Sequence, residues 1–434
     1  MTLNDATRLF IETHLHDDTR QLALKKTPAD VDKLLALSQI EARQILSKKV
    51  PSWAENQNLI FPKHLSIEQC SSELTAKYKT TIVEKIISAK ETHCDAPLQA
   101  DTNRLSTTFV DLTGGLGIDS YFLSENFQNA YYVENQKHLC ELAENNFRIL
   151  GREINVVNTD AESFLEKYSC NSCDSWSKKQ ELHSCNSCDS WCLIFVDPAR
   201  RDAFNRKMVS LRDCSPDAVE LQQKMLEVAE HVLIKASPML DISLICNELK
   251  NIKEIHVVSV KNECKEILIL LERGFSGRIK IVCVNLMQNI IPGQDEFCCL
   301  EDDEKNAAPV YADTIKKYLY EPNSSLMKVG VFKLVSQYYK IDKLHVNSHL
   351  YTSDNLIPDF PGRVFEIVGF APFNKKVRKD LLQDVNEAAV ATRNFPMSAN
   401  DLRKNLGLRE NDENFVFGTT LTREKRIVIL CKRI

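Results

Sequence analysis

The residues best suited to chemistry form the run FVDLTGGLGID, from Phe109 to Asp119. An apolar segment ends in an acid, passes three glycines and continues into a helical pattern. Glycine is needed where the backbone approaches a ligand or adopts a positive φ, so the run predicts a binding turn between a strand and a helix. The spacing differs from the GxGxxG of dinucleotide-binding turns. An acid here would repel a pyrophosphate but could pair with an ammonium group, such as that of S-adenosylmethionine.

Two further acids follow at the ends of the next predicted strands. Glu134 lies 17 residues after Gly117, and Asp160 lies 26 residues after Glu134. A carboxylate in the first place can accept hydrogen bonds from ribose hydroxyls, and one in the second can accept from an adenine amine. Each acid taken singly is also a common strand ending. Together they predict a site for S-adenosylmethionine with these binding residues: Asp111, Thr113, Gly115, Gly117, Glu134 and Asp160.

This order of glycine turn and strand-end acids resembles class I S-adenosylmethionine-dependent methyltransferases. The segment VDPARR (Val196–Arg201) strengthens the resemblance. It stands where amino-directed nucleic-acid methyltransferases carry Asp-Pro-Pro-aromatic, which implies a catalytic role for Asp197, Pro198 and Arg200. Ala199 and Arg200 replace the second proline and the stacking aromatic, although a guanidinium can also stack on a base or bind phosphate. Asp197 would orient the acceptor, with Arg201 also near phosphate or base.

The wider resemblance is to bacterial methyltransferases with a THUMP-like C-terminal domain, and it covers about residue 10 to residue 434. Beyond the core it is carried by the segments YLYEPN (318–323), LHVNSHLYTS (344–353), FPGRVFE (360–366), RNFP (393–396) and FGTTL (417–421). The family implies S-adenosylmethionine as cofactor and structured RNA, either tRNA or rRNA, as the substrate. It does not imply which atom is methylated.

The elements that must position these residues alternate between short apolar runs and helical spans. We predict strands at 130–134, 154–157, 193–196, 231–234, 254–258 and 278–284, which indicates an α/β fold with a doubly wound, mostly parallel sheet. Ahead of it, Thr27-Pro28 predicts a helix start, and a second helix is predicted from Leu65 to Tyr78. Glu68, Gln69, Ser72 and Glu73 on that helix are candidates for covering the cofactor pocket, or belong to an amphipathic surface helix.

We therefore expect a Rossmann-like class I methyltransferase core with a helical N-terminal domain and a C-terminal α/β, THUMP-like region. The predicted boundaries are 1–100 for the helical domain, 101–285 for the core with a low-complexity insertion at 168–191, 286–361 for a connecting α/β region and 362–434 for the THUMP-like domain.

Composition and charge limit the function classes. The chain has 434 residues, 43% hydrophobic and 26% charged, as in ordinary globular proteins. No apolar run reaches the roughly 18 residues of a membrane span. Without an export signal, the 15 cysteines are expected as reduced thiols in the cytoplasm. Residues 362–434 carry 14 Lys and Arg against 9 Asp and Glu, a balance that fits an RNA partner or a local fluctuation. Lys375, Lys376, Arg378, Lys379 and Arg393 are the candidate phosphate contacts.

Two cysteine pairs and two histidines raise the question of a metal. SCNSCDSW occurs twice, at 169–176 and 184–191, which gives CxxC-x11-CxxC, a spacing that suits zinc. Identity of the two copies favours a duplicated surface insertion, so no metal site is predicted. His345 and His349 lack the Glu of a His-Glu-x-x-His site and are expected in a loop.

Methyl transfer to RNA by a direct route is the function that this pattern favours. Covalent catalysis is not expected, because Ser237 stands at the fifth strand where a nucleophilic Cys would be needed. Two alternatives stay open: a non-catalytic RNA-binding protein with a degenerate methyltransferase fold, and a small-molecule methyltransferase.

Overall fold

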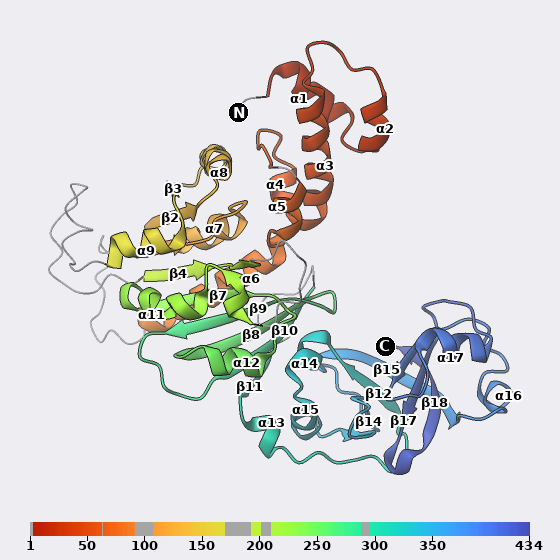
Figure 1. Ribbon diagram of the computed structural model, residues 1–434. Coiled ribbons are helices and arrows are strands. Elements are labelled where there is room, and N and C mark those ends of the chain that lie inside the picture. The colour runs from red at the N-terminus through yellow and green to blue at the C-terminus, as the bar shows by residue number, and fades with distance from the viewer. Residues whose placement is uncertain (1–2, 63, 92–106, 170–191, 201–209, 288–295) are drawn as a thin grey trace. The chain divides into compact units, whose positions relative to one another are not determined.

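The computed structural model describes residues 3–62, 64–91, 107–169, 192–200, 210–287 and 296–434 (Figure 1). The chain divides into two compact units. The first comprises residues 1–255 and 266–277, and the second comprises residues 256–265 and 278–434. The division therefore runs through two strands, β8 (Ile252–Val260) and β9 (Glu263–Glu272).

The first unit begins with helices. Within the described residues these are α1 (Asp5–Thr13), α2 (Thr19–Leu24), α3 (Lys33–Lys49), α4 (Pro51–Ala54), α5 (His64–Gln69) and α6 (Glu73–Glu91). Asp32, whose side chain accepts from the backbone N of Leu35, caps α3. The predicted helix start at Thr27-Pro28 is wrong, because this cap lies five residues later and the proline falls in the preceding loop.

The single helix predicted from Leu65 to Tyr78 is in fact two helices. Its interruption, between the end of α5 and the start of α6, contains Cys70, Ser71 and Ser72. The Ser72 hydroxyl accepts from the backbone N of Thr75 at 3.2 Å, in the manner of a helix cap, and so restarts the helix. The apolar period continues across the break, which is why the pattern alone suggested one helix.

Arg43 ties this helical part together. Only 4% of the residue is exposed. Its guanidinium donates to the carbonyl oxygens of Ala54, Asn56, Gln57 and Leu59 at 2.8–3.1 Å. These carbonyls belong to the end of α4 and the segment after it, so one side chain from α3 satisfies backbone acceptors that no helix or strand would satisfy.

The parallel sheet of the first unit follows. Its strands are β1 (Thr108–Asp111), β2 (Asn129–Glu134), β3 (Asn155–Asn158), β4 (Cys192–Val196) and β7 (His231–Ala236). They pair in parallel in the order β3-β2-β1-β4-β7, and β9 adds to β7 in the antiparallel direction. Each of the six predicted strands lies in or overlaps an observed strand, which confirms the α/β fold, whereas β9 was not anticipated.

Helices connect these strands. They are α7 (Ile118–Leu123), α8 (Lys137–Ile149), α9 (Ala161–Ser169), α11 (Ala218–Val228) and α12 (Ile242–Glu248). Helix α8 packs on β2 and β3, while α11 packs on β4, β7 and α9 (Figure 1). Because the strands run in parallel, their carboxyl ends share one edge of the sheet, and that edge is where ligands bind in such folds. None of the described helices combines the length and apolar composition needed to cross a bilayer.

The second unit contains a seven-stranded sheet in the order β13-β14-β12-β15-β18-β17-β16. It is antiparallel except for β16 and β17. Alternate residues of its strands enter two separate cores: Ile427 and Ile429 lie in one, and Val428 and Leu430 in the other. The strands are β12 (Tyr318–Pro322), β13 (Asp342–Lys343), β14 (Tyr351–Ser353), β15 (Gly362–Pro372), β16 (Ala389–Arg393), β17 (Phe415–Thr420) and β18 (Arg426–Arg433).

The remaining elements of the second unit precede that sheet or lie beside it. Strands β10 (Lys280–Leu286) and β11 (Glu296–Leu300) pair in the antiparallel direction. The helices are α13 (Asp303–Asn306), α14 (Ser324–Val329), α15 (Phe332–Tyr339), α16 (Val377–Leu381) and α17 (Ala399–Leu406).

Replacing Arg43 tests its role in the helical part. Arg43→Met removes the guanidinium donor from one buried and three partly buried carbonyls, so the free energy of unfolding should fall by about 3 kcal/mol. Thermal and urea unfolding followed by circular dichroism would measure the loss. Arg148→Met, which removes an exposed arginine, is the matched control. Equal stability of the two variants would contradict the role of Arg43.

Candidate functional site

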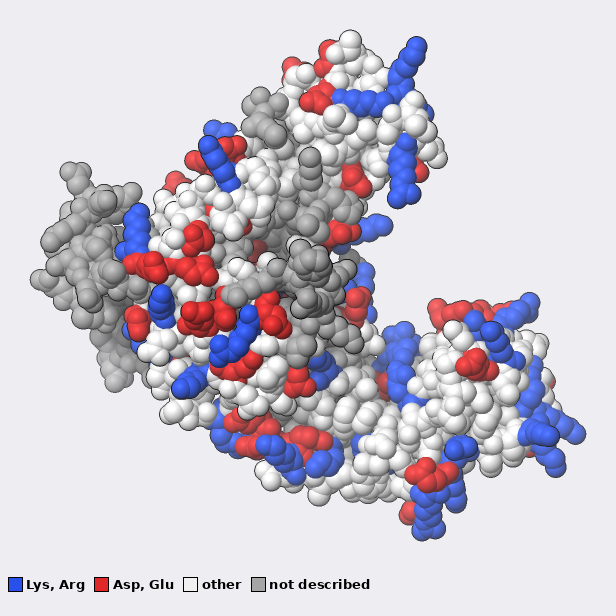
Figure 2. Space-filling model, in the orientation of Figure 1, with Lys and Arg blue, Asp and Glu red and all other residues white. Residues whose placement is uncertain are grey.

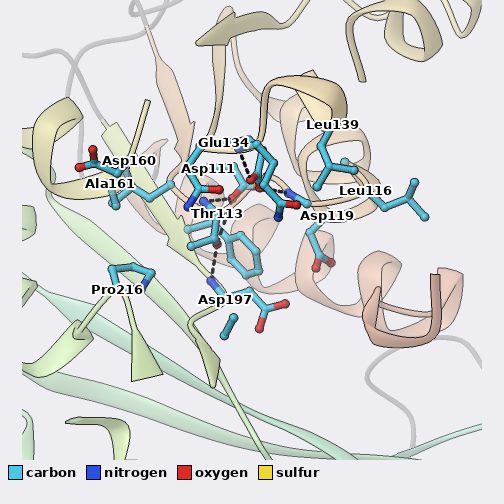
Figure 3. Close-up of a pocket in the computed structure, with 18 of the residues that line it drawn as sticks. Asp111, Thr113, Leu116, Asp119, Glu134, Leu139, Asp160, Ala161, Asp197 and Pro216 are labelled. Atoms are coloured by element: carbon cyan, nitrogen blue, oxygen red, sulfur yellow. Dashed lines mark hydrogen bonds between the residues drawn. The ribbon is translucent and has the colours of Figure 1, made fainter. Parts of the chain in front are cut away.

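The glycine turn lies between β1 and α7, at the carboxyl edge of the parallel strands (Figure 3). Gly115 and Gly117 have φ angles of +54° and +85°. A Cβ on Gly114 would lie 2.2 Å from the Tyr132 ring, and one on Gly117 would lie 2.7 Å from the Phe147 ring. The turn therefore packs directly against these two rings, which also contact each other, and it can do so only because it carries no side chain at Gly114 and Gly117.

Asp111 holds the turn from inside. Its Oδ1 accepts from the backbone N of Thr113 at 2.9 Å, and its Oδ2 accepts from the Ser120 hydroxyl at 2.5 Å. Burial raises the pKa of Asp111 to about 7, against the opposing effect of the hydrogen bonds from Ser120 and Thr113. Both oxygens are thus already bonded within the protein. The structure shows that Asp111 shapes the turn through these two bonds. That Asp111 pairs with an ammonium group of the cofactor stays a prediction.

Glu134 lies at the end of β2 with its carboxylate against the turn. Its Oε2 accepts from the backbone N of Gly115 at 3.0 Å, and its Oε1 accepts from the backbone N of Gln136 at 2.8 Å. A carboxylate has about four acceptor sites, so each oxygen retains one for a ligand hydroxyl. Glu134 is fixed in orientation before any ligand arrives.

These residues line a cavity of about 260 Å³ in the first unit. Asp160 lies on the wall with Ala161 (Figure 3). Its carboxylate accepts hydrogen bonds from the backbone N and the hydroxyl of Ser163, at 2.7 and 2.9 Å. These bonds lower the pKa of Asp160 and cap the start of helix α9. The wall further includes Gln69, Cys70, Ser71, Asp111, Thr113, Gly115, Gly117, Asp119, Glu134, Asp197 and Ala199. Every predicted cofactor-binding residue therefore lies on this cavity.

Asp197 follows β4 and shares the cavity. Its backbone N donates to the Thr113 hydroxyl at 2.6 Å, which joins the end of β4 to the glycine turn (Figure 3). Its carboxylate Oδ2 accepts from the Lys235 ammonium at 2.6 Å. Pro198 follows it directly. Arg200 lies in β5 (Ala199–Arg200), which pairs with β6 (Cys214–Ser215), and Arg201 lies outside the described residues.

The segment between α5 and α6 supplies wall residues that the sequence only partly indicated. Of the four candidates on the predicted helix, Gln69, the last residue of α5, lines the cavity. Cys70 and Ser71, which follow it in the segment between the two helices, line the cavity as well. Glu73 instead accepts from the backbone N and hydroxyl of Ser52 and pairs with Lys77 at 2.7 Å. The apolar period of a helix does not show where the chain breaks, so the wall residues could not be separated from their neighbours.

The motifs considered for a metal are not among the residues that line this cavity. The two CxxC pairs lie in 170–191, outside the described residues. His345 and His349 lie in a loop, as expected; His345 contacts Glu424 at 3.2 Å, and His349 stacks on Phe332 at 3.5 Å between ring centroids. Among the described residues no group of three His, Cys, Asp or Glu side chains is arranged to hold a metal ion.

Comparison with known proteins identifies two family matches within the second unit and a structure similar to the whole chain. Residues 318–361 match a ferredoxin-like domain family, and residues 362–433 match a THUMP domain-like family. A crystal structure assigned to a methyltransferase from Porphyromonas gingivalis is 28% identical, with a TM-score of 0.81 and all of both chains covered. No curated protein matches the chain.

More distant structures are similar to part of the chain. One is assigned to a class I S-adenosylmethionine-dependent methyltransferase from Listeria monocytogenes; it is 10% identical, with a TM-score of 0.36, and covers 67% of this chain and 95% of its own. TrmK from M. capricolum, bound to S-adenosylhomocysteine, is 10% identical, with a TM-score of 0.27, and covers 42% of this chain and 66% of its own.

The full-length relative and the THUMP domain-like match confirm the resemblance, the fold class and the enzyme class expected from the sequence. The chain has a methyltransferase core followed by a THUMP-like region. The residues that line the cavity fit S-adenosylmethionine, the cofactor of that class. At Gly115 a Cβ would meet within 4 Å only the Thr113 carbonyl oxygen, so the turn presents open backbone to the cavity, and Glu134 is oriented with acceptor sites to spare.

The pH dependence of stability tests the buried state of Asp111. Between its ordinary pKa of 3.8 and about 7, the native state binds more protons at Asp111 than the unfolded state does. Stability therefore falls as pH rises through this window, and between about pH 5 and pH 8 the loss is about 3 kcal/mol. The difference in unfolding free energy between wild type and Asp111→Asn should show this slope. The exposed-acid variant Asp412→Asn should not, and parallel curves for all three proteins would refute the shift.

Proposed function

We propose that this protein transfers a methyl group from S-adenosylmethionine directly to structured RNA. The observation that carries the proposal is the bond between the Asp197 backbone and Thr113, because it fixes an acceptor-binding acid and the cofactor turn at one cavity. Methyl transfer without a covalent intermediate needs little beyond holding the donor and acceptor in line and accepting a proton.

Each site residue receives a role in this proposal. Asp111, Thr113, Gly115 and Gly117 form the turn for the methionine end of the cofactor. Glu134 accepts from its ribose, and Asp160 from its adenine. When bound, the cofactor supplies an electrophilic methyl group. Asp197 orients the acceptor, and Pro198 and Arg200 shape the acceptor side, with Arg200 in the place of the usual stacking ring.

The support for RNA comes from the second unit. Residues 362–433 match a THUMP domain-like family. Lys and Arg side chains gather along the edge of the molecule that carries α16 and α17 (Figure 2). Among the candidates, Lys375, Lys376 and Lys379 are exposed and carry the proposed phosphate surface. The RNA classes to test are tRNA and rRNA.

Two of the predicted phosphate contacts have structural partners instead. The Arg378 guanidinium donates to the carbonyls of Leu382 and Val385 and to the Asn386 side chain. Arg393 pairs with the buried Glu321 at 2.6 Å. Removing these two arginines would disturb the domain itself, so the test of RNA binding is confined to the three exposed lysines.

A cytoplasmic location is part of the same proposal. None of the nine cysteines whose side chains the structure describes forms a disulfide, which suits a reducing compartment.

Cofactor binding can be measured directly by calorimetry. Glu134→Ala removes an oriented carboxylate and its charged hydrogen bonds, so binding of S-adenosylmethionine should weaken by about 1–3 kcal/mol. Glu144→Ala, on the neighbouring helix α8 but not on the cavity wall, is the control. No binding to wild type at millimolar cofactor would contradict the proposed enzyme.

RNA binding should depend on the three exposed lysines. Changing Lys375, Lys376 and Lys379 to Gln should weaken binding and reduce the slope of log K against log salt, by about 0.7–0.9 for each phosphate that the protein no longer neutralises. Affinity for S-adenosylmethionine should stay unchanged.

The matched control for this experiment changes Lys25, Lys26 and Lys48 to Gln, three exposed lysines of the N-terminal helical part. Filter binding with bulk tRNA and rRNA over a salt series would compare the two variants. Equal salt slopes for both would locate the RNA surface elsewhere.

A further inference from the structure

A chain of buried charges lies behind Asp197. The Lys79 ammonium, fully buried on α6, contacts Asp119 Oδ1 at 3.1 Å, Glu266 Oε1 at 2.8 Å and the Ser71 hydroxyl at 3.1 Å. Ser71 also donates to Asp119 Oδ2 at 2.6 Å. Lys235 lies 3.9 Å from that same Asp119 oxygen and 2.6 Å from Asp197 Oδ2. Three acids and two lysines thus lead from β9 to the wall of the cavity.

Such a chain is a poor way to gain stability. Removing charges from water costs several kcal/mol for each ion, and apolar residues of similar size would often serve at least as well. A cluster of this kind beside a cavity is instead typical of a functional site. Its exposed end is Asp197, whose side chain is 35% exposed, whereas that of Lys235 is 12% exposed.

Asp197, on the cavity wall, and its partner Lys235, directly behind it, have opposite hydrogen-bonding characters. An ionised Asp197 only accepts hydrogen bonds, and a lysine ammonium only donates them. Burial alone would lower the pKa of Lys235, but the charges of Asp197, Asp119 and Glu266 raise it above its ordinary value, so the ammonium is retained. A group bound to the Asp197 carboxylate lies within about two hydrogen-bond lengths of this ammonium, roughly 5 Å.

We propose, on the basis of the RNA methyl transfer proposed above, that the acceptor is the oxygen of a ribose 2′-hydroxyl, bound by Asp197 with Lys235 as the positioning residue. A hydroxyl both donates and accepts, so it satisfies a carboxylate on one side and an ammonium on the other. RNA carries this hydroxyl at each nucleotide, and DNA lacks it.

Other acceptors suit the site less well. An exocyclic base amine presents two N–H donors and cannot use the Lys235 ammonium, which is itself only a donor. The replacements at Ala199 and Arg200 also remove the proline and the ring expected for a stacked base. A carbon acceptor needs a thiolate, but burial raises the pKa of Cys70, the described cysteine on the cavity wall, and keeps it protonated.

The proposed step transfers one methyl group and releases one proton. A lone pair of the hydroxyl oxygen forms the new C–O bond, and the S–C bond of the sulfonium breaks, leaving its electron pair on sulfur as a neutral thioether. The hydroxyl proton, which becomes strongly acidic as the C–O bond forms, passes to the Asp197 carboxylate and then to water. Lys235 holds the carboxylate in line so that it accepts this proton as the C–O bond forms.

The first test changes the RNA and leaves the protein intact. Bulk RNA from a strain lacking the gene is methylated with radiolabelled S-adenosylmethionine, and the labelled nucleoside is identified by mass spectrometry. We expect the methyl group on the ribose and a labelled linkage that resists alkaline hydrolysis. An RNA with a single 2′-deoxynucleotide at the labelled position should bind the protein normally and accept no methyl group.

The second test concerns Lys235. Lys235→Met should lower kcat by about 10²- to 10³-fold with the KM for RNA unchanged. Because the change also removes a counter-charge of Asp119 and Asp197, the melting temperature should fall, and activity is compared at a temperature at which circular dichroism shows both proteins folded. Lys235→Arg should recover part of the activity, because it keeps the charge and its donors. Lys253→Met, which breaks the pair between Lys253 on β8 and Glu272 on β9, is the control and should keep wild-type activity.

The outcomes separate this inference from the function on which it rests. Absence of methyl transfer to any RNA contradicts the proposed function. Transfer to a base, or full activity on the 2′-deoxy RNA, preserves the proposed function and refutes the ribose acceptor. Ribose methylation that Lys235→Met does not slow refutes the part assigned to Lys235.

Discussion

The site depends on how closely the backbone of one turn packs against two aromatic rings that also contact each other. Tyr132 and Phe147 leave no room for a Cβ at Gly114 or Gly117, and the Tyr132 hydroxyl bonds the carbonyl of Gly115. With its path fixed in this way, the turn directs the Gly115 N–H at Glu134 and the Thr113 hydroxyl at the Asp197 backbone. The strand ends β1, β2 and β4 are thereby held in register around one cavity.

Asp111 shows the cost of this arrangement. Its carboxylate organises the turn, yet it is buried among Asp119 and Asp197, whose charges add to the effect of burial in raising its pKa. The same neighbours attract Lys235 and, through Asp119, Lys79. The acids at the strand ends and the buried lysines are therefore parts of one electrostatic arrangement, in which each charge depends on the others for compensation.

The second unit uses its basic residues in two ways. Arg378 and Arg393 satisfy carbonyls and a buried carboxylate, so their charge is used within the fold. Lys375, Lys376 and Lys379 project from the surface near α16 and have no such role among the described residues. The lysine ammonium is a point charge on a flexible side chain, so it suits the surface proposed to bind RNA phosphates without sequence specificity.

Local sequence determined the strands, the glycine turn and the acids that follow each strand, because alternation of apolar runs and the need for glycine at a crowded turn are properties of neighbouring residues. It also determined the THUMP-like C-terminal region through its motifs. It did not reveal that α5 and α6 are separate, that Arg378 and Arg393 have partners within their own domain, or that Lys79 is fully buried. Those features depend on partners distant in the sequence: Lys79 meets Glu266 across 187 residues. From sequence alone, a charged side chain is predicted to lie at the surface, because its oppositely charged partner is distant in the chain. Only the tertiary structure could therefore place the two lysines behind Asp197.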